Sequence, residues 1–408
     1  MVNKRVFITG ISGFVGSHLA KYLLDSGNQV YGLVRRRADG RKPYSLVDKN
    51  IHNEVQLIEG EITNVSSISF ALDEARPDVV FHLAAQSYVP RSFLNPLETI
   101  ETNTMGTACL LESLRMKELD AKVVLAGSSE EYGLAISSQA QYDRALTKFG
   151  SVFPPPVAIP ELPMSERNPL RPMSPYAVSK VHSEALMINY HVSYGLRTVV
   201  ARTFNTEGPG RGSMFVTSVI TSQVMKLKLG ECTKIVTGNL NTFRDWSHIN
   251  DMVRGYCLLA EKGKHGEVYN QGSMRTNSVL TFILLSLESA GWQVERIADL
   301  QGDKAVDEPT KRDHDRLFGL NFEKTKVDRL MMEGKLEFQP QDRGIQVQTN
   351  KGNILIEFDE SRFRRSEVPI VLSDCRKIEQ LGFTIGYKLD DIIRDQMSCY
   401  LDKGERES

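Results

Sequence analysis

The sequence lacks the features by which secreted and membrane proteins are usually identified. Only 5 of its 408 residues are cysteine, with neither a Cys-x-x-Cys pair nor a disulfide-like spacing among them. Such thiols fit a reducing compartment. The longest apolar stretches, such as residues 279–287, are far shorter than the ~18 residues that a membrane helix needs. No apolar signal region precedes the first predicted strand, so we expect a cytoplasmic protein without a membrane partner.

An excess of charge of either sign is also missing. The 50 basic and 51 acidic residues give a net charge of −1, which leaves no global field to attract nucleic acid. The 8 histidines show no metal-ligand spacing, and the Gly-x-Ser-x-Gly motif of serine hydrolases does not occur. We therefore expect no nucleic-acid partner and no bound metal. Any anionic ligand is expected to be held by local arginines and helix N-termini.

What the sequence does contain is a regular alternation of short apolar runs and amphipathic helical stretches over its first half. This rhythm is typical of a parallel sheet with helices on both faces. The predicted fold class is α/β: a Rossmann-type doubly wound parallel sheet with a smaller C-terminal α/β domain that binds the substrate. We assign residues 1–203 to the first unit and residues 204–408 to the second, whose last helix covers about residues 388–401. The predicted strands are residues 6–9, 29–34, 55–58, 79–83, 122–126 and 198–201.

Two segments interrupt this alternation. Residues 137–169 are rich in proline and serine, with Pro154-Pro155-Pro156 near the centre, and we expect a loop there. Residues 305–358 are rich in charge and look inserted. The last part of this insertion alternates in period two around Asn350-Lys351-Gly352, which predicts a β-hairpin. We expect an excursion in the substrate-binding region, either a lid or subunit contact or a simple surface decoration.

A glycine-rich motif follows the first predicted strand and begins the first helix, with Gly-x-x-Gly-x-x-Gly spacing at Gly10, Gly13 and Gly16. Glycine allows a tight turn close to a pyrophosphate, and the N–H groups at the start of the helix bind its charge. A glycine turn kept for packing alone is the alternative. The expected cofactor-binding residues are Gly10, Ser12, Gly13, Phe14, Val15, Gly16, Arg35, Arg36, Glu61, Ile62, Leu83, Ala84, Ala85, Tyr176 and Lys180.

Arginines stand where the second predicted strand ends, at Arg35-Arg36-Arg37. An NAD-binding enzyme usually has Asp or Glu at this point to accept hydrogen bonds from the ribose hydroxyls. Guanidinium groups instead suit the 2′-phosphate of NADP, which they bind through planar, charge-assisted hydrogen bonds. A solvated basic turn is the alternative, but it does not explain the missing carboxylate. The sequence therefore favours NADP over NAD as the cofactor.

A tyrosine and a lysine four residues apart, Tyr176 and Lys180, begin a predicted helix. This spacing places both on one face, where the ammonium group and the cofactor charge are expected to lower the pKa of the phenol toward neutrality. Tyr176 would then take a proton from a substrate hydroxyl as hydride passes to the cofactor. Such a pair alone is a weak signal. It gains strength because the fifth strand runs into Ser128 and Glu130, at the sheet edge where active sites lie.

These motifs resemble those of the extended short-chain dehydrogenase/reductases, the NAD-dependent epimerase/dehydratase superfamily, and within it the GDP-mannose 4,6-dehydratases most closely. In that family Ser or Thr stands four residues before the Tyr of a Tyr-Gly pair and Glu stands two before it, which are the positions of Ser128 and Glu130. The resemblance covers nearly the whole chain outside residues 137–169 and 305–358. Further matching segments are Gln86-Ser87 with Val89, Ser92 and Phe93, residues 204–212, residues 215–217, Gly238-Asn239, Arg244-Asp245-Trp246 and residues 363–368.

The resemblance also implies a nucleotide-sugar substrate and a homo-oligomer. The residues that match substrate-binding positions of the family are Ser87, Asn205, Arg211, Arg244, Arg364 and Glu367. A diphosphate suits bidentate cations and a ribose diol suits a carboxylate, although each arginine alone is equally well explained as a surface charge. Ser218-Val219 stand where the family usually has a basic pair. Relatives pair the helix after Asn95-Pro96 with the helix at residues 176–194 of a neighbour, so we expect a homodimer or homotetramer.

The implied activity is a 4,6-dehydratase that converts GDP-mannose or a related GDP-hexose to a 4-keto-6-deoxy sugar. It oxidises C4 with NADP, eliminates water across C5–C6 and returns the hydride to C6, so that NADP is regenerated. Ser128, Glu130, Tyr176 and Lys180 would be catalytic, with Glu130 as the C5 base. The alternatives are an epimerase, a decarboxylase or a 4-keto reductase on the same fold, and a non-catalytic dinucleotide sensor. Simple reductases and epimerases need no C5 base, whereas decarboxylases often keep this glutamate.

Overall fold

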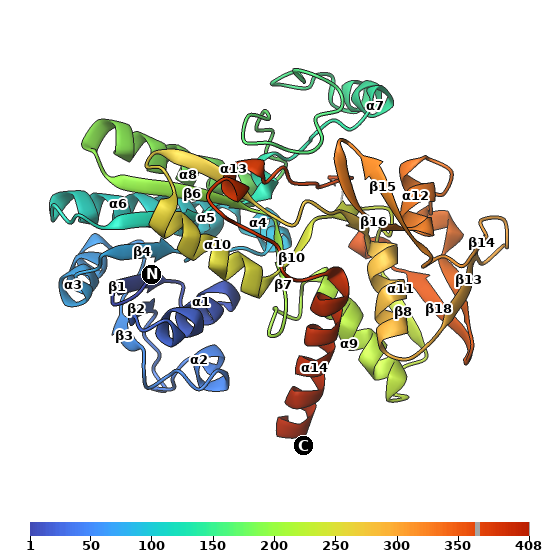
Figure 1. Cartoon of the computed structure of the whole chain (residues 1–408), viewed down its shortest axis with the longest axis horizontal. Helices are drawn as coiled ribbons and strands as arrows, with labels where there is room; N and C mark the ends of the chain where they lie inside the picture. Colours follow the sequence, from blue (N-terminus) through green and yellow to red (C-terminus); the bar gives the residue numbers. More distant parts are fainter. Residues whose placement is uncertain (364–367, 408) are drawn as a thin grey trace.

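The computed structural model describes residues 1–363 and 368–407 and consists of two α/β regions that lie side by side along the long axis of the molecule (Figure 1). The first region is built on a seven-stranded parallel sheet with the order β11-β6-β5-β4-β1-β2-β3. Its strands are β1 (Arg5–Thr9), β2 (Gln29–Val34), β3 (Gln56–Glu59), β4 (Val79–His82), β5 (Lys122–Ala126), β6 (Arg197–Thr203) and β11 (Glu267–Gln271). The predicted doubly wound parallel sheet is confirmed, and each of the six predicted strands overlaps an observed one.

Helices cover both faces of this sheet because its strands carry apolar side chains on both sides. Those on one face are α1 (Phe14–Asp25) and α10 (Ile249–Lys262), and those on the other are α3 (Val65–Ala75), α6 (Gly106–Met116) and α8 (Pro175–Tyr194). Leu19 and Leu23, one turn apart on α1, are fully buried against the sheet. The strand order reverses between β1 and β4, and such a reversal opens a crevice at the carboxyl ends of the strands.

A single cut after residue 203 does not separate the two regions. The chain leaves the first sheet after β6 but returns to it with α10 and β11, and β11 pairs in parallel with β6. The short helix α13 (Arg376–Glu379) also packs on this region through the buried Ile378. The expected boundary at 203 was therefore too simple, because residues 249–271 complete the sheet that residues 1–203 begin.

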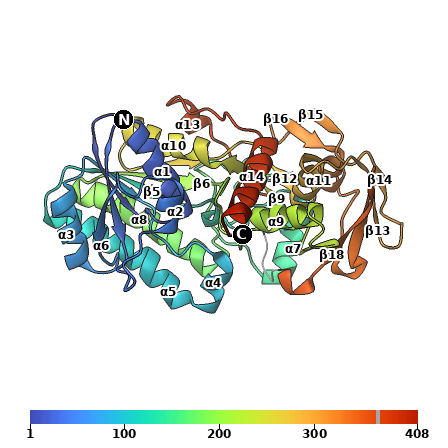
Figure 2. The same ribbon diagram turned by 90° about the horizontal axis from the view of Figure 1, so that it is seen from below.

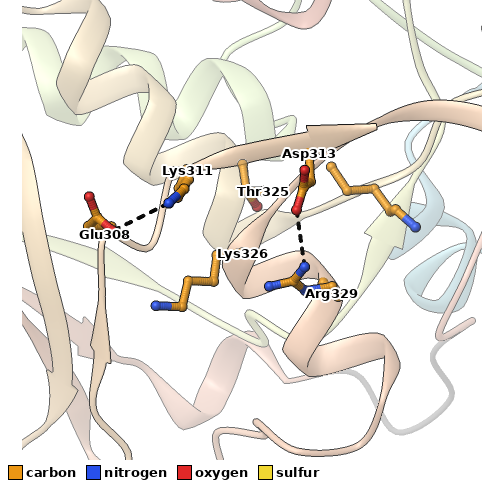
Figure 3. Close-up of a pocket in the computed structure, with 7 residues that line it drawn as sticks. Glu308, Lys311, Asp313, Thr325, Lys326 and Arg329 are labelled. Atoms are coloured by element: carbon orange, nitrogen blue, oxygen red, sulfur yellow. Dashed lines mark hydrogen bonds and ion pairs between the residues drawn. The ribbon is translucent and has the colours of Figure 1, made fainter. Parts of the chain in front are cut away.

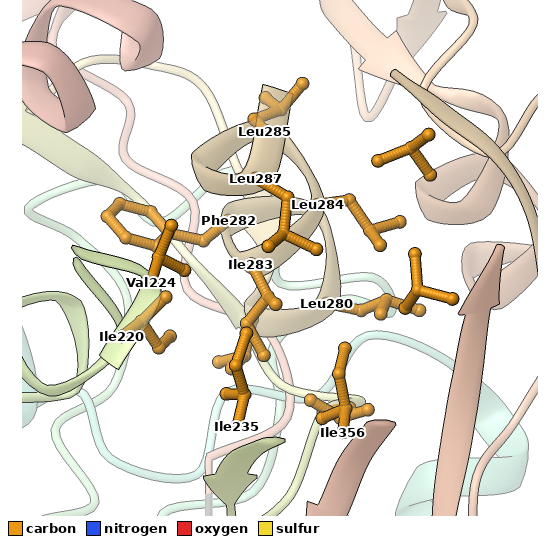
Figure 4. Close-up of a cluster of buried hydrophobic side chains, with 14 of the residues drawn as sticks. Ile220, Val224, Ile235, Leu280, Phe282, Ile283, Leu284, Leu285, Leu287 and Ile356 are labelled. Carbon is orange, nitrogen blue, oxygen red and sulfur yellow. The ribbon is translucent and has the colours of Figure 1, made fainter. Parts of the chain in front are cut away.

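The second region is built on a five-stranded mixed sheet with the order β14-β13-β17-β18-β8. Its strands are β8 (Lys234–Thr237), β13 (Val294–Asp299), β14 (Val306–Asp307), β17 (Gly344–Thr349) and β18 (Gly352–Phe358), and its helices are α9 (Val216–Lys228), α11 (Val279–Ser289) and α14 (Leu389–Glu407). The side chains of α11 point into the core of this region (Figure 4). This explains the apolar stretch at residues 279–287, which is a buried helix. Seen from below, α14 lies across α9 near the junction of the two regions (Figure 2).

The predicted hairpin around Asn350-Lys351-Gly352 is present, since Thr349 pairs with Gly352 between β17 and β18. Its predicted role as an excursion is wrong. The two strands lie in the middle of the five-stranded sheet, and Ile345, Val347 and Ile356 are fully buried in its core. The separate hairpin of β15 (Arg312–Leu317) and β16 (Leu320–Thr325) stands outside this sheet. Only this part of residues 305–358 is an added hairpin, while the later part is core.

The expected loop at residues 137–169 contains a helix, α7 (Gln139–Phe149), which projects from the body of the molecule (Figure 1). Ser138 caps it by accepting a hydrogen bond from the N–H of Gln141. Ser138, one of the serines on which the expectation of a loop rested, is therefore a helix cap. The segment is anchored behind this helix by a buried bidentate pair between Glu161 and Arg171, with N–O distances of 2.7 and 2.8 Å.

The remaining helices are α2 (Tyr44–Asp48), α4 (Val89–Leu94), α5 (Pro96–Ile100) and α12 (Lys326–Met332), and the remaining strands are β7 (Asn205–Glu207), β9 (Phe243–Arg244), β10 (Trp246–His248) and β12 (Asn277–Ser278). A π-helical turn, Glu101–Met105, joins α5 to α6, and a 3-10 turn, Ser129–Glu131, follows β5. Within residues 1–363 and 368–407, no helix has both the length and the apolar composition that crossing a bilayer requires.

Candidate active site

The carboxyl ends of the central strands bring most of the predicted site residues to one edge of the seven-stranded sheet. Gly10 follows β1, Leu83 follows β4, and Ser128 comes two residues after the end of β5. Because parallel strands end at the same edge, these three segments lie at the edge of the sheet where the strand order reverses, the usual place of a binding crevice in such folds. The predicted Glu61 and Ile62 follow β3 farther along the same edge.

The glycine-rich turn has the geometry that a dinucleotide needs. Gly10 has φ +74°, and a Cβ there would lie 2.7 Å from the backbone nitrogen of Ala84. A Cβ on Gly16 would collide with the carbonyl oxygen of Gly10. Gly13 is the N-cap of α1 and supplies no capping side chain, so N–H groups of the first turn remain for an external acceptor. Glycines at these positions therefore fit a pyrophosphate held against the start of α1.

The arginines after β2 differ in their partners. The side chain of Arg37 makes a bidentate pair with Asp39, with N–O distances of 3.0 and 2.7 Å. Arg36 is exposed, and its Nε lies 4.0 Å from the Glu59 carboxylate. Arg35 is also exposed, and no ion pair of this residue is found in the described part of the chain. Arg35 and Arg36 thus expose guanidinium groups that an anion can approach, although Arg36 lies near Glu59, whereas Arg37 is held by Asp39.

The four predicted catalytic residues come together. Ser128 is the N-cap of the 3-10 turn, and its hydroxyl is near enough to the Tyr176 phenol to lower the pKa of that phenol. Tyr176 lies in the first turn of α8, which Ser174 caps by accepting from the N–H of Ala177. Lys180, one turn later, donates from Nζ to the carbonyl oxygen of Ala126 at 2.7 Å. Glu130 lies in the turn that Ser128 caps, and its negative charge is near enough to raise the pKa of Tyr176.

The surroundings of Tyr176 affect the ionisation of its phenol. Burial raises the pKa of Tyr176 above its usual value, and the nearby Glu130 carboxylate raises it further, whereas the Ser128 hydroxyl opposes this. Burial also lowers the pKa of Lys180 to about 8. The sequence-based expectation concerns the phenol with cofactor bound, where the cofactor charge adds to that of Lys180, and it stays a prediction. In the protein alone, burial is the largest influence on the pKa of Tyr176.

Two buried residues near the site were not predicted. Asn103, in the π-helical turn, accepts a hydrogen bond from Gln86 N at 2.8 Å and donates to the Ser179 hydroxyl at 2.9 Å, which ties the segment after β4 to α8. Glu131 has no exposed surface and accepts from Ser128 N at 2.7 Å. The Ser-x-x-Glu spacing of a capping box was a signal for Glu131. No short pattern marked Asn103.

Contacts of the described residues place only some of the predicted substrate-binding residues near the site. Arg211 lies beside the glycine-rich turn, with its guanidinium 5.3 Å from the Phe14 ring centroid and 3.4 Å from that of Phe215. Arg244 donates to the carbonyl oxygen of Val368 at 2.8 Å. Asn205 is at the start of β7, and Ser87 is exposed after β4. Arg364 and Glu367 lie outside the described residues.

A surface cavity of about 240 Å³ lies elsewhere, between the β15–β16 hairpin and α12 (Figure 3). Its cations face anions across short distances, 3.8 Å between Lys311 and Glu308 and 3.1 Å between Arg329 and Asp313. The cavity shares no residue with the crevice and is a solvated set of charge pairs. Among the residues that the structure describes, no group of three or more His, Cys, Asp or Glu side chains could hold a metal ion.

A glycine-rich turn at the switch point of a doubly wound sheet, with Ser128, Tyr176 and Lys180 beside it, defines a dinucleotide-dependent enzyme fold of the short-chain dehydrogenase/reductase type. Residues 6–272 match the model of the NAD dependent epimerase/dehydratase family. The chain belongs to this family.

Comparison with individual proteins agrees with this assignment. The chain is 29% identical to a GDP-mannose 4,6-dehydratase of Vibrio cholerae, over 99% of this chain and 95% of the relative. It is 34% identical to the GDP-mannose 4,6-dehydratase sdnI of Sordaria araneosa over 72% of this chain, but the match spans only 49% of that protein. The solved structure of RMD from Pseudomonas aeruginosa complexed with NADPH matches 98% of this chain and 100% of its own, with a TM-score of 0.66 and 23% identity, a likeness of fold.

Proposed function

We propose that the protein is a nucleotide-sugar 4,6-dehydratase that uses NADP and acts on GDP-mannose or a related GDP-hexose. Glu130 is the observation that carries this proposal, because the turn that Ser128 caps adds a carboxylate to the Ser128–Tyr176–Lys180 group. Oxidation of a sugar carbon needs only the serine, tyrosine and lysine. A further carboxylate at the same centre serves a second proton transfer, which elimination of water requires.

In the first half of the reaction, Tyr176 removes the proton of the C4 hydroxyl, and Ser128 shares this hydrogen bond. When bound, NADP supplies the hydride acceptor for C4 and later the hydride donor for C6. The positive charge of Lys180 stabilises the phenolate that Tyr176 needs in order to accept the proton. Since burial raises the pKa of Tyr176 in the free protein, the site depends on the cation for this step.

In the second half, Glu130 acts on the C5–C6 bond. The C4 ketone makes the proton on C5 acidic, and the Glu130 carboxylate removes it. The hydroxyl group on C6 must then leave with a proton. Ser129, the neighbouring residue of the turn, is a poor proton donor near neutral pH. Glu130 therefore passes the proton that it has taken to the departing oxygen, and one water leaves per sugar. Return of the hydride to C6 would leave an enolate, which takes a proton at C5 from solvent through Glu130, while the proton that Tyr176 took from the C4 hydroxyl is released to solvent.

The nucleotide and cofactor preferences follow from the arginines. Arg35 and Arg36 supply two exposed guanidinium groups for a 2′-phosphate, which supports NADP over NAD. Arg211 and Arg244, with Asn205, are the described candidates for the diphosphate and ribose of the substrate. The GDP-mannose 4,6-dehydratases among the relatives support guanine as the base and mannose as the sugar.

The test is to incubate the purified protein with NADP and separately with GDP-, UDP- and dTDP-hexoses and to weigh the products by mass spectrometry. The proposal expects a GDP-hexose to lose one water with no net change in NADPH absorbance. A product of unchanged mass would identify an epimerase, loss of carbon dioxide from a uronic acid a decarboxylase, and stoichiometric NADPH consumption with a 4-keto sugar a reductase. Any of these outcomes, without a dehydrated product, overturns the dehydratase.

A further inference from the structure

Glu131, the residue that follows the proposed base Glu130 in the sequence, is a fully buried carboxylate. Its Oε1 accepts a hydrogen bond from Ser128 N at 2.7 Å, and the Ser128 hydroxyl accepts from the N–H of Glu130 at 3.2 Å. This reciprocal arrangement closes the short turn on itself. The turn that carries both Ser128 and Glu130 is therefore fixed from within by Glu131.

The second oxygen of Glu131 faces a buried ion pair. Arg202, on β6, donates from Nε and Nη2 to the two oxygens of Glu184 at 2.7 and 2.5 Å. The Nε of Arg202 also lies 3.6 Å from Oε2 of Glu131. Glu184 is on α8, one turn beyond Lys180, so the ion pair joins β6 to the helix that carries Tyr176. Arg202 and Glu184 therefore connect the turn that contains Glu131 to both β6 and α8.

The charges in this cluster do not balance. At ion-pair distance, Glu131 and Glu184 share the single guanidinium of Arg202, and the ammonium group of Lys180 donates to the carbonyl oxygen of Ala126 instead. Two carboxylates with one close cation leave an excess negative charge in a buried space, which is strongly unfavourable. Arg202 cannot compensate both carboxylates, because it already gives Nε and Nη2 to Glu184 and Nη1 to the Tyr132 hydroxyl at 3.0 Å. Among the described residues, Oε2 of Glu131 has no hydrogen-bond partner although it is buried.

A proton on Oε2 of Glu131 would remove both the excess negative charge and the lack of a hydrogen-bond partner. It would cancel the excess charge, and it would let Glu131 donate a hydrogen bond to the Glu184 carboxylate. In agreement with this geometry, burial and the charge of Glu184 raise the pKa of Glu131 well above its usual value.

We infer that Glu131 shares a single proton with Glu184 and is a positioning residue of the active site. The shared hydrogen bond fixes the position of the turn that carries Glu130 relative to α8, the helix that carries Tyr176 and Lys180. This inference rests on the proposed function of these three residues, but it does not depend on which sugar or base the enzyme binds.

The pKa of Lys180 links the ionisation of Glu131 to the pH dependence of catalysis. An ionised Glu131 would raise the pKa of Lys180, whereas a neutral Glu131 would leave it to the effect of burial. The titratable and charged groups around the pair are Glu130 and Tyr132 on the same turn, Tyr176 and Lys180 on α8, Arg202 on β6, Glu166 on the segment before α8, and Tyr256 on α10.

Two substitutions distinguish an effect of the shared hydrogen bond from an effect of side-chain packing. Glu131→Gln keeps an acceptor for Ser128 N and supplies an N–H to Glu184, so it imitates the protonated acid permanently. Glu131→Leu has a similar size and supplies neither. We expect Glu131→Leu to lower kcat by about 10–100-fold, because small misplacement of a reacting group has effects of this order. The Kd of NADP should stay unchanged, and Glu131→Gln should restore most of the lost kcat with the alkaline limb of its pH profile at the wild-type position.

An infrared measurement on the NADP complex without sugar supplies a readout that needs no turnover. The wild-type minus Glu131→Gln difference spectrum should contain the carbonyl band of a protonated, buried carboxylic acid. If that band is absent, or if the alkaline limb of Glu131→Gln moves to lower pH, Glu131 is ionised and the inference is wrong. If Glu131→Leu keeps wild-type kcat, the positioning role is wrong. If the band is present in a protein without dehydratase activity, the proposed function alone fails.

Discussion

The two regions of the molecule build their sites in different ways. In the first region, each functional group belongs to a short stretch of chain: residues 10–16 for the pyrophosphate, residues 128–131 for the proposed base, and residues 176–180 for the tyrosine and lysine. The second region is assembled from segments that are distant in sequence, as when Leu355 of β18 pairs with Lys234 of β8. Local patterns therefore reveal the chemistry of the first region, whereas the substrate-binding side depends on long-range pairing.

The largest expected effect concerns the chemistry of the first region. Glu130→Gln should lower the rate of dehydration by about 10²–10⁴-fold, the usual loss for a positioned general base. C4 oxidation does not use this carboxylate, so NADPH absorbance should appear and persist when the variant is mixed with substrate. Stopped-flow absorbance and product mass together measure both halves of the reaction.

Ser129→Ala, in the same turn, is the matched control for Glu130→Gln. If Glu130 serves as both base and acid, loss of the serine hydroxyl should leave dehydration within about 3-fold of wild type, because a serine is a poor acid near neutral pH. Wild-type turnover by Glu130→Gln would refute the assignment of the base.

The next effect concerns the core of the second region. Ile356→Ala in β18 should destabilise the protein by about 2–5 kcal/mol, as expected for truncation of a fully buried isoleucine. Gln348→Ala, on the exposed side of the neighbouring strand, is the control and should have little effect. Chemical denaturation measures both. An unaffected Ile356→Ala protein would restore the view of this hairpin as a surface excursion.

The sequence alone predicts the first sheet well, because parallel βαβ units combine apolar strands with amphipathic helices in a regular order. It does not predict that β11 returns to this sheet, since the pairing of Glu267 with Val199 is a long-range contact. The hairpin at residues 344–358 was recognised from its alternation, yet its place in the sheet was not. Period-two alternation specifies a strand and its two faces but not the strand beside it. In the site, Glu131 carried a local signal and Asn103 did not.

A smaller effect is expected at the cofactor. Replacing Arg35 and Arg36 together by Ala should weaken NADP binding by about 10–100-fold while NAD binding changes little, because only NADP carries the 2′-phosphate. Arg37→Ala is the matched control, since that arginine is already paired with Asp39. Fluorescence titration with both dinucleotides provides the measurement. Equal weakening of NAD and NADP, or a wild-type preference for NAD, would contradict the assignment.

The smallest effect on catalysis is expected from the subunit interface. Leu94 and Leu97 at α4 and α5, with Val178 on α8, expose apolar side chains on adjacent helices, and a homodimer or homotetramer would cover them. Leu97→Glu should lower the mass measured by light scattering while NADP binding is retained. Phe70→Glu, at an exposed position on α3, is the control and should leave the mass unchanged. A wild-type monomer at micromolar concentration would rule out the oligomer.

The central claim is that one site oxidises C4, eliminates water and returns the same hydride. A substrate carrying deuterium on C4 tests it directly, with the position of the label in the product determined by NMR. The account predicts that the deuterium moves from C4 to C6 of a 4-keto-6-deoxy sugar and that NADPH does not accumulate. Deuterium that remains on C4, or that leaves the sugar in released NADPH, would contradict it.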